Sequence, residues 1–106
     1  MPNWDDLKVF LAVARAESLS AAAPVLKMDP ATVSRRIARL EDDLGAALFL
    51  KSPQGYALSE SGDRLLPHAE AAEQVFAGAD EELSGIAGQL TELLLLGYVR
   101  IYNPFD

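Results

Sequence analysis

The sequence of 106 residues predicts a mainly α-helical fold, in which three helices and a small β-hairpin precede one long helix. Three observations predict it. Residues 29–45 have the pattern of an amphipathic helix with a start and a stop signal, and two short apolar runs flank a turn at residues 52–55. Apolar residues then recur with heptad spacing from residue 65 to residue 93.

The helix predicted over residues 29–45 is marked at both ends. Asp29 is a favourable N-cap, because its carboxylate can accept a hydrogen bond from an otherwise unpaired backbone N–H. Pro30 suits the first helical position, where no backbone donor is needed, and Gly45 suits the left-handed residue that follows a helix. Apolar residues step by four, three and four along one side and form a stripe: Val33, Ile37, Leu40 and Leu44.

The opposite side of this helix is polar and basic. It carries Arg35, Arg36 and Arg39, with hydroxyl groups at Thr32 and Ser34. Such a surface suits an anionic partner, and the alternative is an ordinary solvated surface. The segments before and after the helix favour the anionic partner.

Two helices are expected before residue 29. The first begins near residue 4, with Asn3 or Asp5 as its N-cap, and ends at residues 17–19. The second covers residues 21–27, with Ser20 as its N-cap and with Val25 and Leu26 in the core. The apolar residues of the first helix follow the helical period and predict one buried face: Trp4, Leu7, Phe10, Leu11 and Ala14.

About three residues separate the second helix from the helix at 29–45. Two helices joined so closely form a helix-turn-helix, whose second helix can enter the major groove of DNA. The runs 46–51 and 56–59 then flank a turn with Pro53 and Gly55, which predicts a hairpin. A hairpin at this place is a wing, with Lys51 and Gln54 near its tip, where a cation suits the DNA backbone or minor groove.

The net charge of −7 argues against a nucleic-acid partner when it is taken over the whole chain, but it is unevenly distributed. Residues 1–62 carry seven basic and eight acidic residues, whereas residues 63–106 carry two basic and eight acidic residues. Lys27, Lys51 and the three arginines therefore form a basic cluster in a nearly neutral segment, which is compatible with DNA binding.

Several function classes are disfavoured by composition. There is no cysteine, which excludes disulfides and thiolate chemistry and suits a reducing cytoplasm. The acidic N-terminal residues do not resemble a signal peptide, and the apolar runs, such as residues 93–96, are too short to cross a membrane. His68 is the only histidine, and no metal cluster, phosphate loop or nucleophile–base pair is visible. We therefore expect no enzyme, no metal, no cofactor and a cytoplasmic location.

A long helix is expected after Ser59, which suits its N-cap. Its apolar residues alternate in steps of four and three, which predicts packing against another helix. The seam would extend roughly 40 Å at 1.5 Å per residue, which is longer than the preceding segment can cover, so self-association is favoured. Pro67 is expected to bend this helix or to leave one carbonyl unpaired. The seam consists of Leu65, Ala69, Ala72, Phe76, Ala79, Leu83, Ile86, Leu90 and Leu93.

Residues 1–62 resemble the winged helix-turn-helix head of LysR-type transcriptional regulators. The resemblance implies a bacterial regulator that binds an imperfect inverted repeat in double-stranded DNA as a homodimer, with its linker helix as the dimer contact. It rests on the order and spacing of these motifs: Leu7…Phe10, Ser18-Leu19-Ser20-Ala21-Ala22-Ala23…Leu26, Val33-Ser34-Arg35-Arg36-Ile37…Leu40-Glu41…Leu44-Gly45…Leu48-Phe49, and Lys51…Gly55…Leu58-Ser59…Gly62.

The resemblance also implies a role for each part of the chain. Residues 1–58 would be the DNA-binding domain, with recognition helix 30–44 and wing 49–58. Residues 59–97 would be the linker helix, and residues 98–106 a stub that resembles the first strand of an effector domain, through the pattern Gly97-Tyr98-Val99-Arg100-Ile101. The base-edge candidates are Pro30, Ala31, Thr32, Ser34 and Arg35, the phosphate candidates are Arg36 and Arg39, and the wing candidates are Lys51 and Gln54.

The sequence departs from the family pattern in the wing, where arginine is usual at the positions of Lys51 and Gln54. Arginine suits a narrow minor groove better than lysine does, so the departure lowers the expected affinity of the wing. No membrane partner and no small-molecule effector are expected on this chain.

Two alternatives remain open. The chain could be a protein-interaction module that pairs with a full-length regulator without binding DNA strongly, which the net charge of −7 favours. It could also be a winged-helix repressor of another family, which the long heptad helix directly after the wing disfavours.

Overall fold

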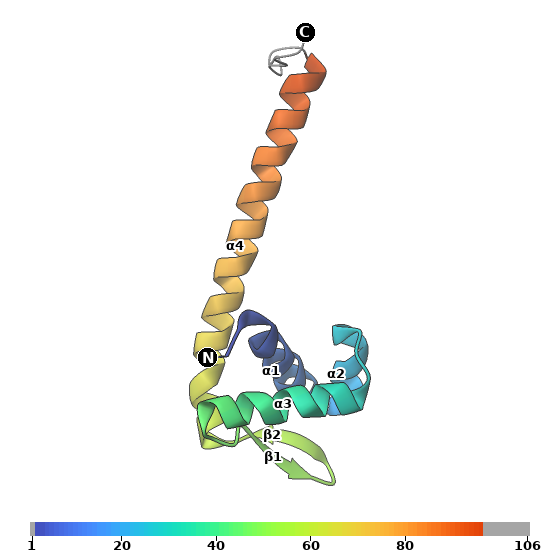
Figure 1. Ribbon diagram of the computed structural model, residues 1–106, viewed down its shortest axis with the longest axis vertical. Helices are drawn as coiled ribbons and strands as arrows, with labels where there is room; N and C mark the ends of the chain where they lie inside the picture. Colours follow the sequence, from blue (N-terminus) through green and yellow to red (C-terminus); the bar gives the residue numbers. More distant parts are fainter. Residues whose placement is uncertain (1, 97–106) are drawn as a thin grey trace. The chain divides into compact units, whose positions relative to one another are not determined.

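The computed structural model describes the backbone of residues 2–96 and the side chains of residues 2–83 (Figure 1). The predicted mainly helical fold with a wing and a long helix is confirmed. By its internal contacts the chain divides into two units, residues 1–73 and residues 74–106. The elements are α1 (Trp4–Ala16), α2 (Leu19–Leu26), α3 (Pro30–Leu44), β1 (Phe49–Ser52), β2 (Gly55–Leu58) and α4 (Glu60–Leu96).

Helix α1 begins with a capping box. The side-chain oxygen of Asn3 accepts a hydrogen bond from the backbone N–H of Asp6 at 3.0 Å, so Asn3 rather than Asp5 is the N-cap. The predicted buried face is partly right, since Phe10 and Leu11 are buried whereas Trp4, Leu7 and Ala14 are only half-buried. Prediction missed Val9 and Val13, which are also buried, because α1 packs against both α2 and α3 and buries more than one stripe.

Helix α2 begins two residues earlier than predicted. Its N-cap is Ser18, whose hydroxyl oxygen accepts a hydrogen bond from the N–H of Ala21 at 3.2 Å, so the expected cap at Ser20 is wrong. Ala22 and Ala23 are buried, and Leu26 is half-buried on the same side.

The prediction that Val25 lies in the core is also wrong. Its exposed fraction is 76%, because the buried side of α2 consists of positions 22, 23 and 26, and position 25 points away from them. Alanines on this side allow α2 to approach its neighbours closely, so Ala22 and Ala23 rather than Val25 form the contact with the core.

Helix α3 begins and ends as predicted. Asp29 caps its N-terminus, Pro30 occupies the first turn, and Gly45 follows it in the left-handed conformation with φ 69°. The stripe is buried over three of its four members, Val33, Ile37 and Leu40, whereas Leu44 is 39% exposed at the end of the helix.

The predicted hairpin is confirmed. Strands β1 and β2 pair antiparallel, with Phe49 opposite Leu58 and Ser52 opposite Gly55. The Phe49 ring lies between those of Phe10 and Tyr56, with centroid distances of 5.4 and 5.8 Å. The N–H of Tyr56 also donates to the carbonyl oxygen of Glu17 at 2.9 Å, so the hairpin is fixed to the end of α1.

The first turns of α4 belong to the core of the first unit. The hydroxyl of Ser59 accepts from the N–H of Gly62 at 3.0 Å and donates to the carbonyl oxygen of Ala47 at 2.6 Å, which confirms the predicted cap. Four turns later, Glu73 forms a bidentate ion pair with Arg15 of α1, at 2.8 and 2.7 Å. Through this hydrogen-bonded contact the guanidinium of Arg15 lowers the pKa of Glu73, and the carboxylate of Glu73 raises the pKa of Arg15.

This packing corrects part of the predicted dimer seam. Ala69 has no exposed surface and Leu65 is half-buried against the core, so these two side chains face their own chain. Heptad spacing predicts a buried side but not which neighbour buries it. Ala72 is half-buried, Ala79 is exposed and Leu83 is 67% exposed. The side chains of residues 86, 90 and 93 and the predicted strand-like stub at residues 98–106 lie outside the described part.

Two helical glycines of α4 differ in what surrounds them. A Cβ atom at Gly62 would overlap the carbonyl oxygen of Leu48 and lie 2.9 Å from a methyl carbon of Leu58, whereas a Cβ atom at Gly78 would meet nothing within 4 Å. Close approach of α4 to the hairpin therefore requires glycine at position 62.

We predict opposite effects of alanine at these two positions. Gly62→Ala should lower the free energy of unfolding by about 1–3 kcal/mol through overpacking. Gly78→Ala should raise helix stability by roughly 0.5–1 kcal/mol, because alanine loses less backbone entropy. Urea unfolding followed by circular dichroism measures both. A Gly62→Ala protein as stable as the Gly78→Ala protein would show that the close approach is no constraint.

Candidate nucleic-acid interface

The exposed side of α3 forms the larger part of a candidate interface, which we call the α3 face. Burial of positions 33, 37 and 40 turns the polar residues outward, because successive helix positions are about 100° apart. Arg35 and Ala31 are exposed, and Thr32, Ser34 and Arg36 are half-buried. The α3 face consists of Pro30, Ala31, Thr32, Ser34, Arg35, Arg36 and Arg39.

Hydrogen bonds order the side chains at the start of this face. The hydroxyl of Thr32 donates to Asp29 Oδ1 at 2.5 Å, and its backbone N–H donates to Asp29 Oδ2 at 3.3 Å. Arg35 Nη2 then donates to the hydroxyl oxygen of Thr32 at 3.0 Å. This chain of contacts holds one guanidinium over the first turn of α3, with donors left for an external acceptor.

The same contacts change the acidity of the cap. Hydrogen bonds from the hydroxyl and then from the backbone N–H of Thr32 favour the charged carboxylate, so they hold the pKa of Asp29 below its ordinary value of 3.8. The cap therefore stabilises the fold fully above pH 3.8, the ordinary pKa, and loses its contribution as the pH falls through the lowered pKa of the folded protein.

Cations from other elements lie near Arg36. A surface pocket of about 440 Å³ between α1, α2 and α3 has Arg36, Lys8 and Lys27 in its lining, together with the acid Asp5. Lys8 was missed by the sequence analysis, since it lies on α1 and only the packing of the first unit brings it near α3. No local pattern could have found it.

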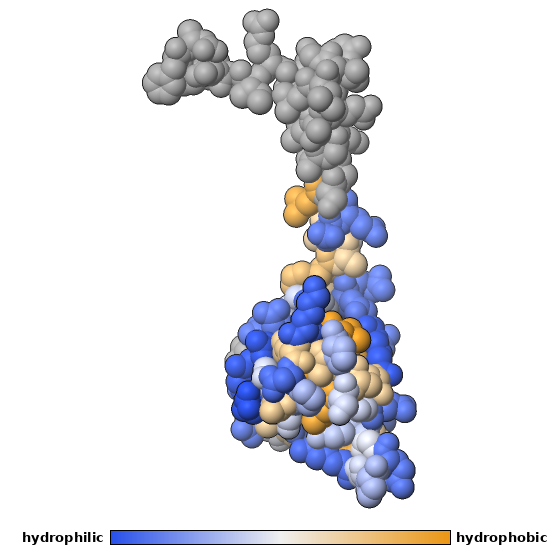
Figure 2. Space-filling model, turned by 90° about the vertical axis from the view of Figure 1, so that its right-hand side faces the viewer, coloured by the Kyte–Doolittle hydropathy of each residue, from blue (hydrophilic) through white to orange (hydrophobic). Residues whose placement is uncertain are grey.

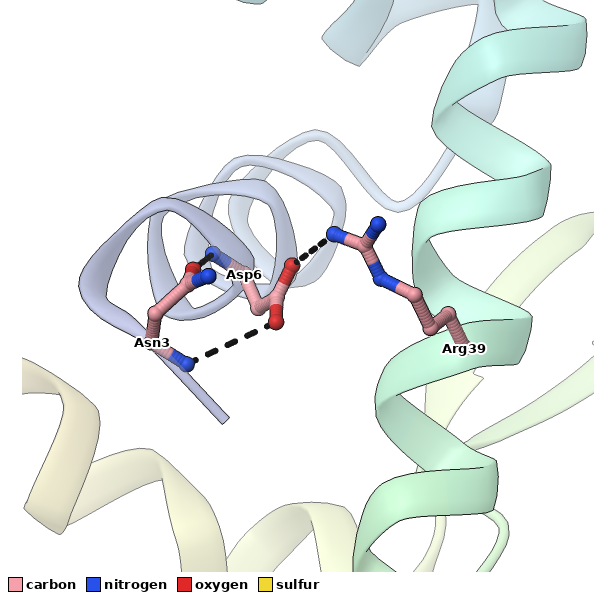
Figure 3. A network of polar contacts seen from close by, with 3 residues as sticks. All are labelled: Asn3, Asp6 and Arg39. Atoms are coloured by element: carbon pink, nitrogen blue, oxygen red, sulfur yellow. Dashed lines mark hydrogen bonds and ion pairs between the residues drawn. The ribbon is translucent and has the colours of Figure 1, made fainter. Parts of the chain in front are cut away.

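Arg39 has a partner within the protein. Its Nη2 donates to Asp6 Oδ1 at 2.7 Å, and the exposed fractions of the two side chains are 55% and 2% (Figure 3). Figure 3 shows the guanidinium extending from α3 towards α1, with Asp6 between it and Asn3. The hydrogen bond from Arg39 to Asp6 raises the pKa of Arg39. The predicted phosphate contact of Arg39 therefore has to coexist with this ion pair.

The end of α3 is acidic. Asp42 and Asp43 are exposed, and Glu41 accepts a hydrogen bond from the N–H of Leu48 at 2.8 Å. Cations thus lie on the first ten residues of the helix and acids on its last turn, which limits the surface available to a polyanion to the N-terminal part.

The hairpin supplies the second part of the candidate interface. Pro53 and Gln54 form its two-residue turn, where the N–H of Gln54 donates to the hydroxyl of Ser52 at 3.2 Å. Lys51 lies on β1, with its ammonium 5.8 Å from the centre of the Tyr56 ring. Both predicted wing residues, Lys51 and Gln54, are exposed.

Neither a cluster of metal-ligand side chains nor a membrane-spanning helix is found in the part of the chain that the structure describes. In the described chain, no three histidine, cysteine or acidic side chains gather in a way that could hold a metal ion. Of the helices between residues 2 and 96, none combines the length and the apolar character needed to cross a membrane.

Comparisons with known proteins match this geometry. A family model described as "Bacterial regulatory helix-turn-helix protein, lysR family" matches residues 4–63. The transcriptional regulator TrpI of Pseudomonas aeruginosa is 40% identical over 90 residues, which cover 85% of this chain and 28% of TrpI. DmlR of Escherichia coli is 35% identical over 105 residues, which cover 99% of this chain and 33% of DmlR. The chain thus spans about a third or less of the length of these relatives.

Solved structures match as well. The crystal structure of a CbnR DBD–DNA complex has a TM-score of 0.71 at 32% identity, covering 82% of this chain and 99% of that chain. The crystal structure of Vibrio fischeri DarR in complex with DNA has a TM-score of 0.74 at 25% identity, covering 84% of this chain and 30% of that chain.

The cap of α3 gives a test of how the α3 face is ordered. Asp29→Ala should lower the melting temperature at pH 7 by roughly a few degrees, as is typical for loss of an N-cap. The difference from the wild type should shrink as the pH falls below 3.8, where the lowered pKa is approached and the cap is lost in both proteins.

The matched control is Asp42→Ala, at the other end of the same helix. An acid there opposes the helix dipole, so its removal should not lower the melting temperature. Thermal unfolding by circular dichroism between pH 7 and pH 3 measures both. A pH-independent effect of Asp29→Ala would contradict the role of its charge.

Proposed function

Because the chain belongs to the LysR family of bacterial regulatory helix-turn-helix proteins, we propose that it acts as the sequence-specific double-stranded DNA-binding module of a dimeric transcriptional regulator. The family consists of transcriptional regulators and not of enzymes, and the chain matches the N-terminal region of such proteins.

The observation that carries the proposal is the division of α3 into two sides. One side is buried over three apolar residues, and the other presents three arginines and two hydroxyl groups beside an exposed hairpin. The similar structures include those of CbnR and DarR, each described as a complex with DNA. An amphipathic helix with such a face has the diameter to enter the major groove.

Each part of the α3 face then has a role in the proposed complex. Arg35, Thr32 and Ser34 read base edges, since a guanidinium can bind guanine with two hydrogen bonds and hydroxyls bind several bases. Pro30 and Ala31 are small and apolar, which suits contact with a thymine methyl group. Arg36 and Arg39 bind phosphates and so fix the position of the helix on the DNA. Lys51 and Gln54 on the wing contact the adjacent backbone or minor groove.

The charge of the chain limits how such a module attracts DNA. The net charge is −7, so long-range attraction is weak and affinity depends on local contacts. About three cations per protomer would neutralise about six phosphates in a dimer, and each contributes about −0.9 to the salt slope, which gives roughly −5.

The dimer is proposed to form through α4 beyond the part that packs on the first unit. Phe76 is 50% exposed and Leu83 is 67% exposed, and both lie on the heptad seam. In Figure 2 apolar surface is interspersed with polar surface along the described part of α4 below the grey residues. A two-fold dimer places two recognition helices on successive major grooves, so its site is an imperfect inverted repeat.

The alternative is a protein-interaction module, which pairs with a full-length regulator and modulates it without strong DNA binding. The acidic residues Glu70, Asp80, Glu81 and Glu82 on α4 favour it, because they repel DNA. The arginines of the α3 face oppose it.

A fluorescence-anisotropy titration separates the two functions. It compares duplex DNA from beside the protein's own gene with scrambled duplex of equal composition, at two salt concentrations. Tight, salt-dependent binding that prefers the native duplex supports the DNA-binding module. Equal, weak binding of both duplexes by a dimer of confirmed size supports the interaction module.

One prediction of the proposed function concerns base readout. Arg35→Ala should weaken binding to the native duplex by roughly 1–3 kcal/mol and should weaken binding to scrambled duplex much less, because a bidentate base contact is lost. Arg64→Ala is the matched control, since Arg64 is an exposed arginine on α4, outside the α3 face. Equal losses on both duplexes would mean that Arg35 contacts only phosphate.

The second prediction concerns the dimer. Leu83→Lys should shift the protein towards the monomer, because it places a charge in the proposed seam, whereas Ala77→Lys adds the same charge to an exposed position outside the seam. Sedimentation velocity at several concentrations measures the association of both variants. If they dissociate alike, or neither does, α4 does not pair through this seam.

A further inference from the structure

Asp6 is a buried carboxylate whose charge has one partner. Among residues 2–83 it is the charged residue in the core, with an exposed fraction of 2%. A buried carboxylate is unfavourable unless it is paired and hydrogen-bonded. Arg39 supplies the pair, through Nη2 at 2.7 Å from Oδ1 (Figure 3).

The capping box of α1 does not account for this charge. Its contact from the backbone N–H of Asn3 to Asp6 Oδ2 is long, at 3.5 Å, whereas the contact to Arg39 is short. A neutral amide at position 6 would satisfy the same capping contact. The carboxylate at this position is therefore explained by Arg39 and not by the start of α1.

Arg39 has capacity for a second acceptor. It is 55% exposed, and one of its five N–H donors is engaged by Asp6. It follows Arg35 by four positions and so shares its side of α3. Besides Asp6, the exposed acid Asp43 also acts electrostatically on Arg39.

We propose that Asp6 is a positioning residue, which holds the guanidinium of Arg39 at the edge of the α3 face so that its remaining donors bind a DNA phosphate. This inference rests on the proposed function. An arginine has many side-chain conformations, and fixing one of them before binding removes an entropic cost that binding would otherwise bear. The ion pair also joins α1 to α3, so the group that contacts the phosphate is anchored to a buried side chain of the core.

The proposal predicts an effect opposite in sign to simple electrostatics. Asp6→Asn removes a negative charge close to the DNA-facing helix, so charge alone predicts tighter binding. Positioning predicts binding about two- to tenfold weaker per protomer, the factor typical of one immobilised long side chain. Because the contact is to phosphate, the loss should be equal on native and scrambled duplex.

The experiment is an anisotropy titration of the full chain, well below the melting temperature of every variant. Arg39→Gln keeps a hydrogen-bond donor for Asp6 but removes the charge, and it should reduce the magnitude of the salt slope by about one per protomer. The double variant should bind no more weakly than Arg39→Gln, since Asp6 acts through Arg39. Asn3→Ala is the control, because it weakens the same capping box without touching the ion pair.

The outcomes are distinct. Weaker binding by Asp6→Asn, with wild-type affinity for Asn3→Ala, supports the positioning role. Unchanged or tighter binding by Asp6→Asn overturns it, as does an equal loss in Asn3→Ala, which would trace the effect to the stability of α1. If the wild type binds no duplex, the proposed function is rejected and this inference with it. A wild type that binds, with an unaffected Asp6→Asn, rejects the inference alone.

Discussion

The burial of one side of α3 is the constraint on which the rest of the structure depends. Val33, Ile37 and Leu40 are almost fully buried in one core with Phe10 and Leu11 of α1. Each such side chain contributes about 1.5–3 kcal/mol when it leaves water. Burial of three positions on one stripe fixes the rotation of the helix about its axis, so the polar side chains are turned towards the solvent. The α3 face is thus a consequence of core packing.

Helix α1 is the common support of both parts of the candidate interface. It packs under α3 and also fixes the hairpin, through the contact of Phe10 with Phe49 and through the hydrogen bond from Tyr56 to the carbonyl oxygen of Glu17. A surface assembled from two elements keeps its geometry only if both are held by the same rigid body. The ion pairs of α1 with α3 and with the first turns of α4 extend this support to the polar side chains.

Local patterns predicted the helices, the hairpin and both caps of α3, because caps and amphipathic stripes are properties of a few neighbouring residues. They misplaced the start of α2, since Ser18 and Ser20 can both act as N-caps and only tertiary packing selects between them. They also could not assign Ala69 to its own core or connect Asp6 to Arg39, because these contacts join elements that are distant in sequence. The candidate face was therefore predictable as a set of residues, but its supports were not.

The separation of the two sides of α3 has a consequence for how proteins of this kind diverge. Ala31 and Arg35 are exposed and Ser34 is half-buried, so under the proposed function the sequence preference can change at these positions without crossing the stability threshold that limits most mutations. Arg39 is different, because its loss leaves a carboxylate unpaired in the core. Under the proposed function, a new preference can therefore evolve at the N-terminal end of the helix, whereas substitution one turn later is restricted.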